Sequence, residues 1–195
     1  MEHSCVDCGL NGCRKPDGPH PAFCPANGFD LENETWLQER LAEPENRCAI
    51  EAAAVSAGRA IDDKLSRLEE TVVLAKGLGV KKIGVAACVS LAPEARAAAK
   101  ALRAEGFDVV GAICKMGTIT HADLDLHVGR KPESVLCNPI YQAKVLNDER
   151  TDLNVVIGLC AGHDSLFIKY ADALCTTLVV KDWKYDHHSV LALRG

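Results

Sequence analysis

Four cysteines near the amino terminus have a spacing that suggests metal chemistry. They follow the pattern C-x2-C-x4-C-x10-C, at Cys5, Cys8, Cys13 and Cys24. The surrounding segment, residues 1–30, contains half of the eight prolines and almost no periodic apolar pattern, so it cannot build a core of its own. Such a segment needs a ligand in order to fold. The spacing therefore predicts that the four thiolates bind a metal ion or a metal cluster.

Zinc and iron–sulfur clusters both accept four thiolate ligands. Zinc ribbons usually carry two short C-x2-C knuckles, whereas this segment has one, followed by irregular gaps. Cys24 precedes Pro25, as in the Cys-Pro ending of ferredoxin motifs. We therefore expect an iron–sulfur cluster of the [4Fe-4S] type, with Zn²⁺ as the alternative. A thioredoxin-type redox pair at Cys5 and Cys8 is disfavoured, because no strand precedes it and no helix follows it.

The rest of the chain alternates between apolar runs and helical periodicity. Short apolar runs at 81–90, 107–115, 152–160 and 175–183 predict buried strands. Helical spacing appears at 49–63, 64–79, 92–106 and 163–173, and a further helix is expected to start with Asn138 as its N-cap and Pro139 at its first position. This alternation predicts an α/β fold, a doubly wound, Rossmann-like parallel sheet of about four to five strands, following the irregular Cys-rich amino-terminal segment.

A second group of cysteines lies where the predicted strands end. In a parallel sheet the carboxyl ends of all strands share one edge, and ligands bind there at the point where the strand order reverses. If the first strand is central, Cys88 and Cys160 flank that crevice. The expected second ligand set is Cys88, Cys114, Cys137 and Cys160. Cys48, in an early helix, and Cys175, at the opposite edge, are expected to be core or incidental thiols.

The residues after Cys160 fit a cluster-bearing loop. Gly162 permits a tight turn, and the following helix start offers N–H groups that favour negative charge. Without a metal, the same features are expected to lower the pKa of Cys160 and to make it a candidate nucleophile. His163 and Lys115 are the candidates for supplying a proton or a positive charge, although each also fits an ordinary polar position.

Composition restricts the classes of partner. The chain has 195 residues and a formal net charge of −5, which gives no basic field for nucleic acid, and no apolar run is long enough to span a bilayer. We expect a cytoplasmic protein with a metal-binding segment at 1–30 and an α/β domain at 31–195. Reducing compartments disfavour structural disulfides, so ten cysteines favour metal or redox chemistry.

Several stretches resemble a known family. The stretches CNPIYQAKVLN, TDLNVVIGLCAGHDSLFIKY and TTLVVKD, together with the cysteine-rich start, are similar to the prokaryotic family of predicted metal-binding proteins termed domain of unknown function 1847. The resemblance implies metal binding through the four amino-terminal cysteines and supplies no substrate. The carboxyl-terminal sequence departs from the more usual VVKDR followed by HNP, so the resemblance assigns no role to His187 or His188.

Two functions of different classes follow from the sequence. The first is an iron–sulfur protein for redox chemistry or electron transfer, acting with a redox partner protein or a small molecule. The second is a zinc-stabilised binding or regulatory module without catalysis. Nucleotide binding is disfavoured, because neither G-x-G-x-x-G nor a P-loop follows the first predicted strand.

Overall fold

The chain folds into two compact units. The computed structural model describes residues 4–194, and its compact units are Met1–Arg47 and Cys48–Gly195. The division at residue 30, expected from the cysteine content, stays a prediction. Within the described residues, no helix combines the length and the apolar character that crossing a membrane requires.

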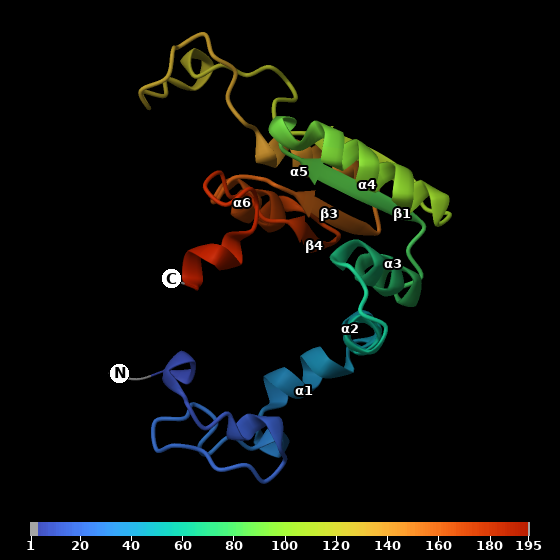
Figure 1. The fold of residues 1–195 in the computed structure, drawn as a ribbon, viewed down its shortest axis with the longest axis vertical. Helices are drawn as coiled ribbons and strands as arrows, with labels where there is room; N and C mark the ends of the chain where they lie inside the picture. Colours follow the sequence, from blue (N-terminus) through green and yellow to red (C-terminus); the bar gives the residue numbers. More distant parts are fainter. Residues whose placement is uncertain (1–3, 195) are drawn as a thin grey trace. The chain divides into compact units, whose positions relative to one another are not determined.

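The larger unit contains a four-stranded sheet (Figure 1). Its strands are β1 (Lys82–Ala87), β2 (Asp108–Ile113), β3 (Leu153–Ile157) and β4 (Leu174–Val179). They lie in the order β2-β1-β3-β4, and every neighbouring pair is parallel. The predicted parallel α/β sheet is confirmed, with β1 and β3 in the centre.

Helices cover both faces of the sheet, which makes the fold doubly wound and Rossmann-like. They include α3 (Arg67–Gly77), α4 (Ala92–Ala104), α5 (Pro139–Asp148) and α6 (His163–Tyr170). Figure 1 shows α4 in front of the sheet and α5 behind it, and α5 packs against α6. An ion pair between Lys76 and Glu105 joins α3 to the end of α4. Because both faces are covered, every residue of β3 is buried.

Local sequence signals account for the helix boundaries. The Ser66 hydroxyl accepts the backbone N–H of Glu69, whose carboxylate accepts the N–H of Ser66, so a capping box starts α3. The Asn138 side chain accepts the Tyr141 N–H at 3.0 Å, and Pro139 opens α5, as predicted. Gly79, with φ of 72°, follows the end of α3 in the left-handed conformation typical of helix ends.

Helical structure begins earlier than the sequence pattern predicts. Helix α1 spans Thr35–Ala42 and α2 spans Pro44–Asp62, whereas the first expected helix spans residues 49–63. Helix α1 has only eight residues and none of them is buried, so the stretch is too short for the repeated apolar spacing that marks the predicted helices. Short 3-10 helices are η1 (Cys5–Asp7), η2 (Gly12–Arg14), η3 (Leu31–Asn33), η4 (Val89–Leu91), η5 (Ala122–Leu124) and η6 (Ser189–Leu193).

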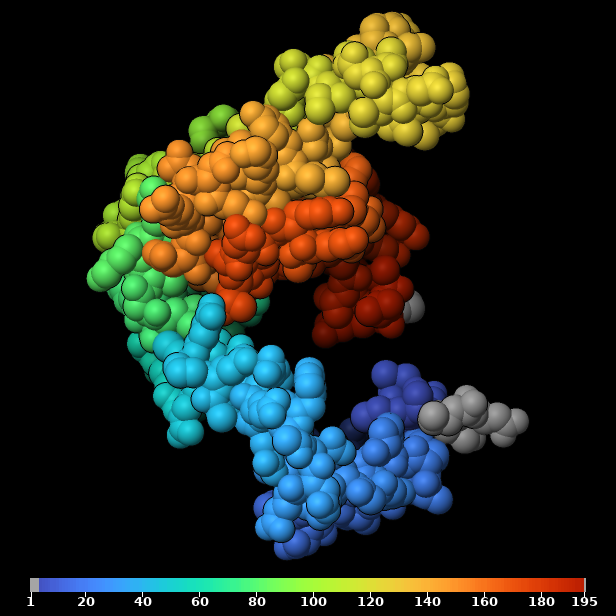
Figure 2. Space-filling model, turned by 180° about the vertical axis from the view of Figure 1, so that it is seen from behind, coloured from blue at the N-terminus to red at the C-terminus, as the bar shows by residue number. Residues whose placement is uncertain are grey.

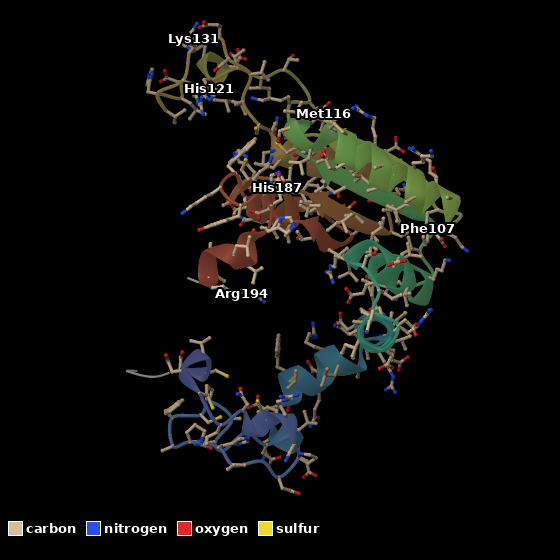
Figure 3. The ribbon with its side chains drawn as sticks, viewed as in Figure 1. Phe107, Met116, His121, Lys131, His187 and Arg194 are labelled. Carbon is tan, nitrogen blue, oxygen red and sulfur yellow. The ribbon has the colours of Figure 1, made fainter. Side chains whose placement is uncertain are left out.

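A long excursion, residues 117–137, separates β2 from α5. Figure 2 shows it protruding from the larger unit, and Figure 3 labels His121 and Lys131 within it. Its two arms meet at a single antiparallel bridge between Thr120 and Val135. The second arm returns to the sheet, where the Asn138 N–H donates to the Cys114 carbonyl at 2.7 Å. This connection brings Cys137 next to the end of β2.

Candidate metal centres

The four amino-terminal cysteines surround one cavity. It has a volume of about 300 Å³, and its walls include Asn11, Gly12, His20, Phe23 and Pro25 beside the thiols. Cys5 and Cys13 are exposed, and Cys8 and Cys24 are partly buried. The folding of the segment thus brings all four cysteines of the C-x2-C-x4-C-x10-C pattern to one concave surface.

Two glycines allow the loops around this cavity to meet. A Cβ atom on Gly12 would lie 2.0 Å from the Pro19 carbonyl oxygen, and one on Gly18 would lie 1.9 Å from the Gly12 oxygen. No other residue type fits such an approach of backbone to backbone. This contact fixes the loop that links Cys13 to Cys24.

Backbone hydrogen bonds hold the cysteine-bearing turns. The Cys8 N–H donates to the Cys5 carbonyl at 3.2 Å, and the Cys24 N–H donates to the Pro21 carbonyl at 2.9 Å. The Asn27 side-chain amide also donates to the Pro21 carbonyl, at 2.9 Å. The segment is therefore organised by turns and glycine contacts instead of an apolar core.

The inner cysteines follow the strand ends as predicted from the sequence. Cys88 and Cys114 come directly after β1 and β2, and Cys160 lies three residues after the end of β3. The Cys114 N–H donates to the Ala87 carbonyl at 3.0 Å, and the Cys88 N–H donates to the Ile157 carbonyl at 3.1 Å. These hydrogen bonds continue the sheet ladder by one step and place Cys88 between β2 and β3, at the topological switch point.

Cys114 lies next to Cys137 and is strongly resistant to ionisation. Burial, followed by the charges of the Cys137 and Cys88 thiolates and a hydrogen bond with Cys137, raises its pKa to about 12. The Val89 N–H, which donates to the Cys114 sulfur at 3.4 Å, opposes this change only in part. The Cys137 and Cys88 thiols thus lie close enough to Cys114 to oppose its ionisation.

Cys160 joins this group, but the expected effect of the helix start is wrong. Burial raises the pKa of Cys160, and the charges of Cys88 and Cys137 raise it further. The first N–H groups of α6, those of His163 and Asp164, donate to the Cys160 backbone carbonyl at 2.9 and 3.1 Å. Because the backbone oxygen accepts these donors, the helix start does not make Cys160 an activated nucleophile.

Cys88 has the opposite environment. Burial acts to raise its pKa, but the Ser90 hydroxyl, the Ser90 N–H and the Lys181 ammonium together outweigh burial and lower the pKa. The Ser90 hydroxyl lies 3.2 Å from the Cys88 sulfur, and Lys181 Nζ donates to the same hydroxyl at 2.5 Å. Sequence reasoning missed Lys181, although it lies two residues after β4 ends and so at the same edge as the cysteines.

A buried amide supports the strand ends beneath the thiols. Gln142 of α5 is fully buried, and its Nε2 donates to the carbonyls of Ala87, at 3.2 Å, and Ala112, at 2.7 Å. Ala87 directly precedes Cys88, and Ala112 precedes Cys114 by two residues. Gln142 therefore fixes the separation of β1 and β2 at the site. Its position within an otherwise apolar helix face is the sequence signal that could have identified it.

The other candidates lie as follows. The Lys115 ammonium donates to the Val135 carbonyl in the returning arm of the excursion. His163 is half-buried at the first position of α6, close in sequence to Cys160. Cys48 is exposed in α2, and Cys175 lies at the amino-terminal end of β4. His187 accepts the Asp182 N–H through Nδ1 and lies in the carboxyl-terminal segment (Figure 3).

Across residues 4–194, no three side chains of His, Cys, Asp or Glu are grouped so as to hold a single metal ion. The assignment of the two cysteine sets as metal ligands stays a prediction.

Comparison with known proteins places the chain in a family. The family model described as "Protein of unknown function (DUF1847)" matches residues 24–178. The chain belongs to this family. The match begins at Cys24 and spans all four inner cysteines, which makes the inner set a part of the family domain.

Uncharacterized protein MJ0455 of Methanocaldococcus jannaschii is 41% identical over 134 residues, which is 67% of each chain. No solved structure is similar to the chain.

Proposed function

We propose that this member of the DUF1847 family is an iron–sulfur protein that transfers electrons. Cys5, Cys8, Cys13 and Cys24 would hold one cluster, of the [4Fe-4S] type. Cys88, Cys114, Cys137 and Cys160 would hold a second at the carboxyl edge of the sheet. Each centre would supply one-electron chemistry, and the exchange would take place with a redox partner protein or a small molecule.

The observation that supports this proposal most directly is the cavity ringed by the four amino-terminal cysteines. Its volume of about 300 Å³ equals roughly ten water molecules in the liquid. A structural zinc site closes on the ion, with four sulfurs about 2.3 Å from it. Four thiols spaced around a larger space suit an inorganic core of several iron and sulfide atoms better than a single ion.

The inner thiols support a second centre for a different reason. They come from the ends of β1, β2 and β3 and from the start of α5, so only the folded sheet brings them together. The thiolate charges of Cys88 and Cys137 oppose the ionisation of both Cys114 and Cys160. Converging thiols of this kind need a cation to hold them ionised, and a metal centre supplies it.

The residues around the inner set have separate roles in this proposal. Gln142 holds the ends of β1 and β2 in place, and the Lys115 ammonium holds the arm that carries Cys137. His163, half-buried and three residues after Cys160, would pass a proton to a small molecule. If three of the inner thiolates bind, the remaining iron position is open to that molecule.

Metal and sulfide analysis of full-length protein prepared without oxygen tests the proposal. We expect a brown protein with about eight iron and about eight sulfide per chain. Substitution Cys13→Ser is expected to lower the iron content to about four, and Cys114→Ser to do the same from the other centre.

Cys48→Ser is the matched control, because Cys48 is exposed and outside both sets. It should leave the iron content unchanged. A colourless protein with one zinc and no iron would refute the proposal and support the zinc-stabilised binding module.

A further inference from the structure

Lys181 lies at the same edge of the sheet as the inner thiols. It follows β4, is half-buried, and its Nζ donates to the Ser90 hydroxyl at 2.5 Å. The same ammonium lies over the ring of Trp183, 4.4 Å from the ring centroid. The hydroxyl and the ring therefore hold the ammonium in one position, which a free surface lysine would not keep.

This positive charge faces two of the inner thiols. The Ser90 hydroxyl that accepts from Nζ lies 3.2 Å from the Cys88 sulfur, and the Lys181 charge acts to lower the pKa of both Cys88 and Cys160. These two cysteines follow the central strands β1 and β3, between which the strand order reverses. Among the described residues, no carboxylate forms an ion pair with Lys181.

We infer that Lys181 is a positioning residue that sets the reduction potential of the inner centre, with Ser90 holding its ammonium toward Cys88 and Cys160. This inference rests on the proposed function. Reduction adds one electron to the centre and breaks no bond, so its net charge becomes more negative by one. A fixed positive charge nearby stabilises the reduced form more than the oxidised form. Loss of that charge should therefore lower the potential.

Potentiometric titration of the full-length holoprotein with dithionite as electron donor tests this role. We expect Lys181→Met to lower the midpoint of the inner centre, with a roughly tenfold smaller ratio of reduced to oxidised centre at a fixed potential, which corresponds to about 59 mV for one electron. Lys181→Arg should keep most of the wild-type value. Ser90→Ala, at an exposed position, should shift the midpoint in the same direction by less.

Lys184→Met is the matched control. Lys184 also lies over an aromatic ring, 5.0 Å from the Tyr185 centroid, and the substitution removes the same charge three residues away. Its midpoint should equal that of the wild type. Equal midpoints for Lys181→Met and Lys184→Met, with the iron content preserved, would overturn the inference alone.

Failure of the proposed function has a different result. A full-length variant with serine at the four amino-terminal cysteines should keep the inner centre and identify its midpoint. If this variant and the wild type contain no iron or sulfide at the inner set, the centre is absent, and the role of Lys181 is refuted with it.

Discussion

At the scale of single residues, neighbouring thiols in this protein differ widely in acidity. Cys88 and Cys114 follow adjacent strands, and both are buried. Burial dominates at Cys114 and raises its pKa to about 12, whereas Ser90 and Lys181 outweigh burial at Cys88 and lower its pKa. The difference comes from hydrogen-bond donors and one ammonium, because both side chains are removed from water to a similar degree. In a metal-free protein, this asymmetry controls which thiol ionises first.

The raised pKa of Cys114 predicts a loss of stability in alkaline solution. Its folded-state pKa is above the ordinary thiol value of 9.0, so the folded state keeps the proton after the unfolded chain has released it. The stabilisation is complete below about pH 9 and falls as the pH rises toward 12. For metal-free, reduced protein we expect a lower free energy of unfolding at about pH 10.5 than at pH 7, measured by urea denaturation.

Cys114→Ser should show a smaller decrease in the free energy of unfolding between the same two pH values, because serine does not titrate there. The free energy of unfolding of Cys48→Ser, which changes an exposed thiol, should decrease as much as that of the wild type. An equal decrease in all three proteins would assign the effect to other groups and contradict the prediction.

At the scale of elements, the amino-terminal loops depend on glycine instead of a core. The loop contact between Gly12 and residues 18–19 leaves no room for a Cβ atom. We expect Gly18→Ala, whose Cβ would lie 1.9 Å from the Gly12 oxygen, to separate the loops and to lower the iron content from about eight to about four per chain. Iron analysis combined with far-UV circular dichroism measures both the site and the remaining fold.

Gly9→Ala is the control for this prediction. Gly9 lies in the same segment, and a Cβ there would meet no atom within 4 Å. Its iron content should match that of the wild type. Full iron content in Gly18→Ala would show that the loop contact does not position the cysteines.

The elements also show how much of the fold the sequence could predict. The strands were predictable because a sheet covered on both faces requires continuous apolar runs, such as the one that became β3. Helix α5 was predictable because Asn138 and Pro139 each have a physical reason to start a helix. Helix α1 was not, because its eight residues give too few turns for a repeated apolar pattern and none of its side chains is buried.

The site was predictable only in part, for a related reason. Strand ends fix where Cys88 and Cys114 lie, because parallel strands share a carboxyl edge. The contact of Lys181 with Ser90 joins the ends of β4 and β1, which are not adjacent in the sheet, so no local pattern reports it. Whether the pKa of Cys160 is raised or lowered depends on which atom accepts the α6 N–H groups, and the sequence does not specify that atom.

At the scale of the whole molecule, the two proposed centres lie in separate compact units. The amino-terminal set lies within Met1–Arg47 and the inner set within Cys48–Gly195. The family model covers mainly the second unit, from Cys24 to residue 178. The buried core also belongs to the second unit, since its members run from Ala75 to Phe167. The second unit therefore has enough buried apolar residues to fold without the first unit, whereas the first unit would depend on the proposed cluster.

This organisation predicts that a shortened chain keeps one centre. A protein that begins at Pro44 keeps α2, whose Ala52 packs next to Gly77 of α3, and loses the four amino-terminal cysteines. We expect about four iron and about four sulfide per chain, and a cooperative urea transition with the same midpoint as the inner unit of the full-length protein. A full-length variant with serine at Cys5, Cys8, Cys13 and Cys24 provides the matched comparison. Loss of all iron, or a broad transition in the shortened chain alone, would mean that the sheet needs the first unit and that the two units do not fold independently.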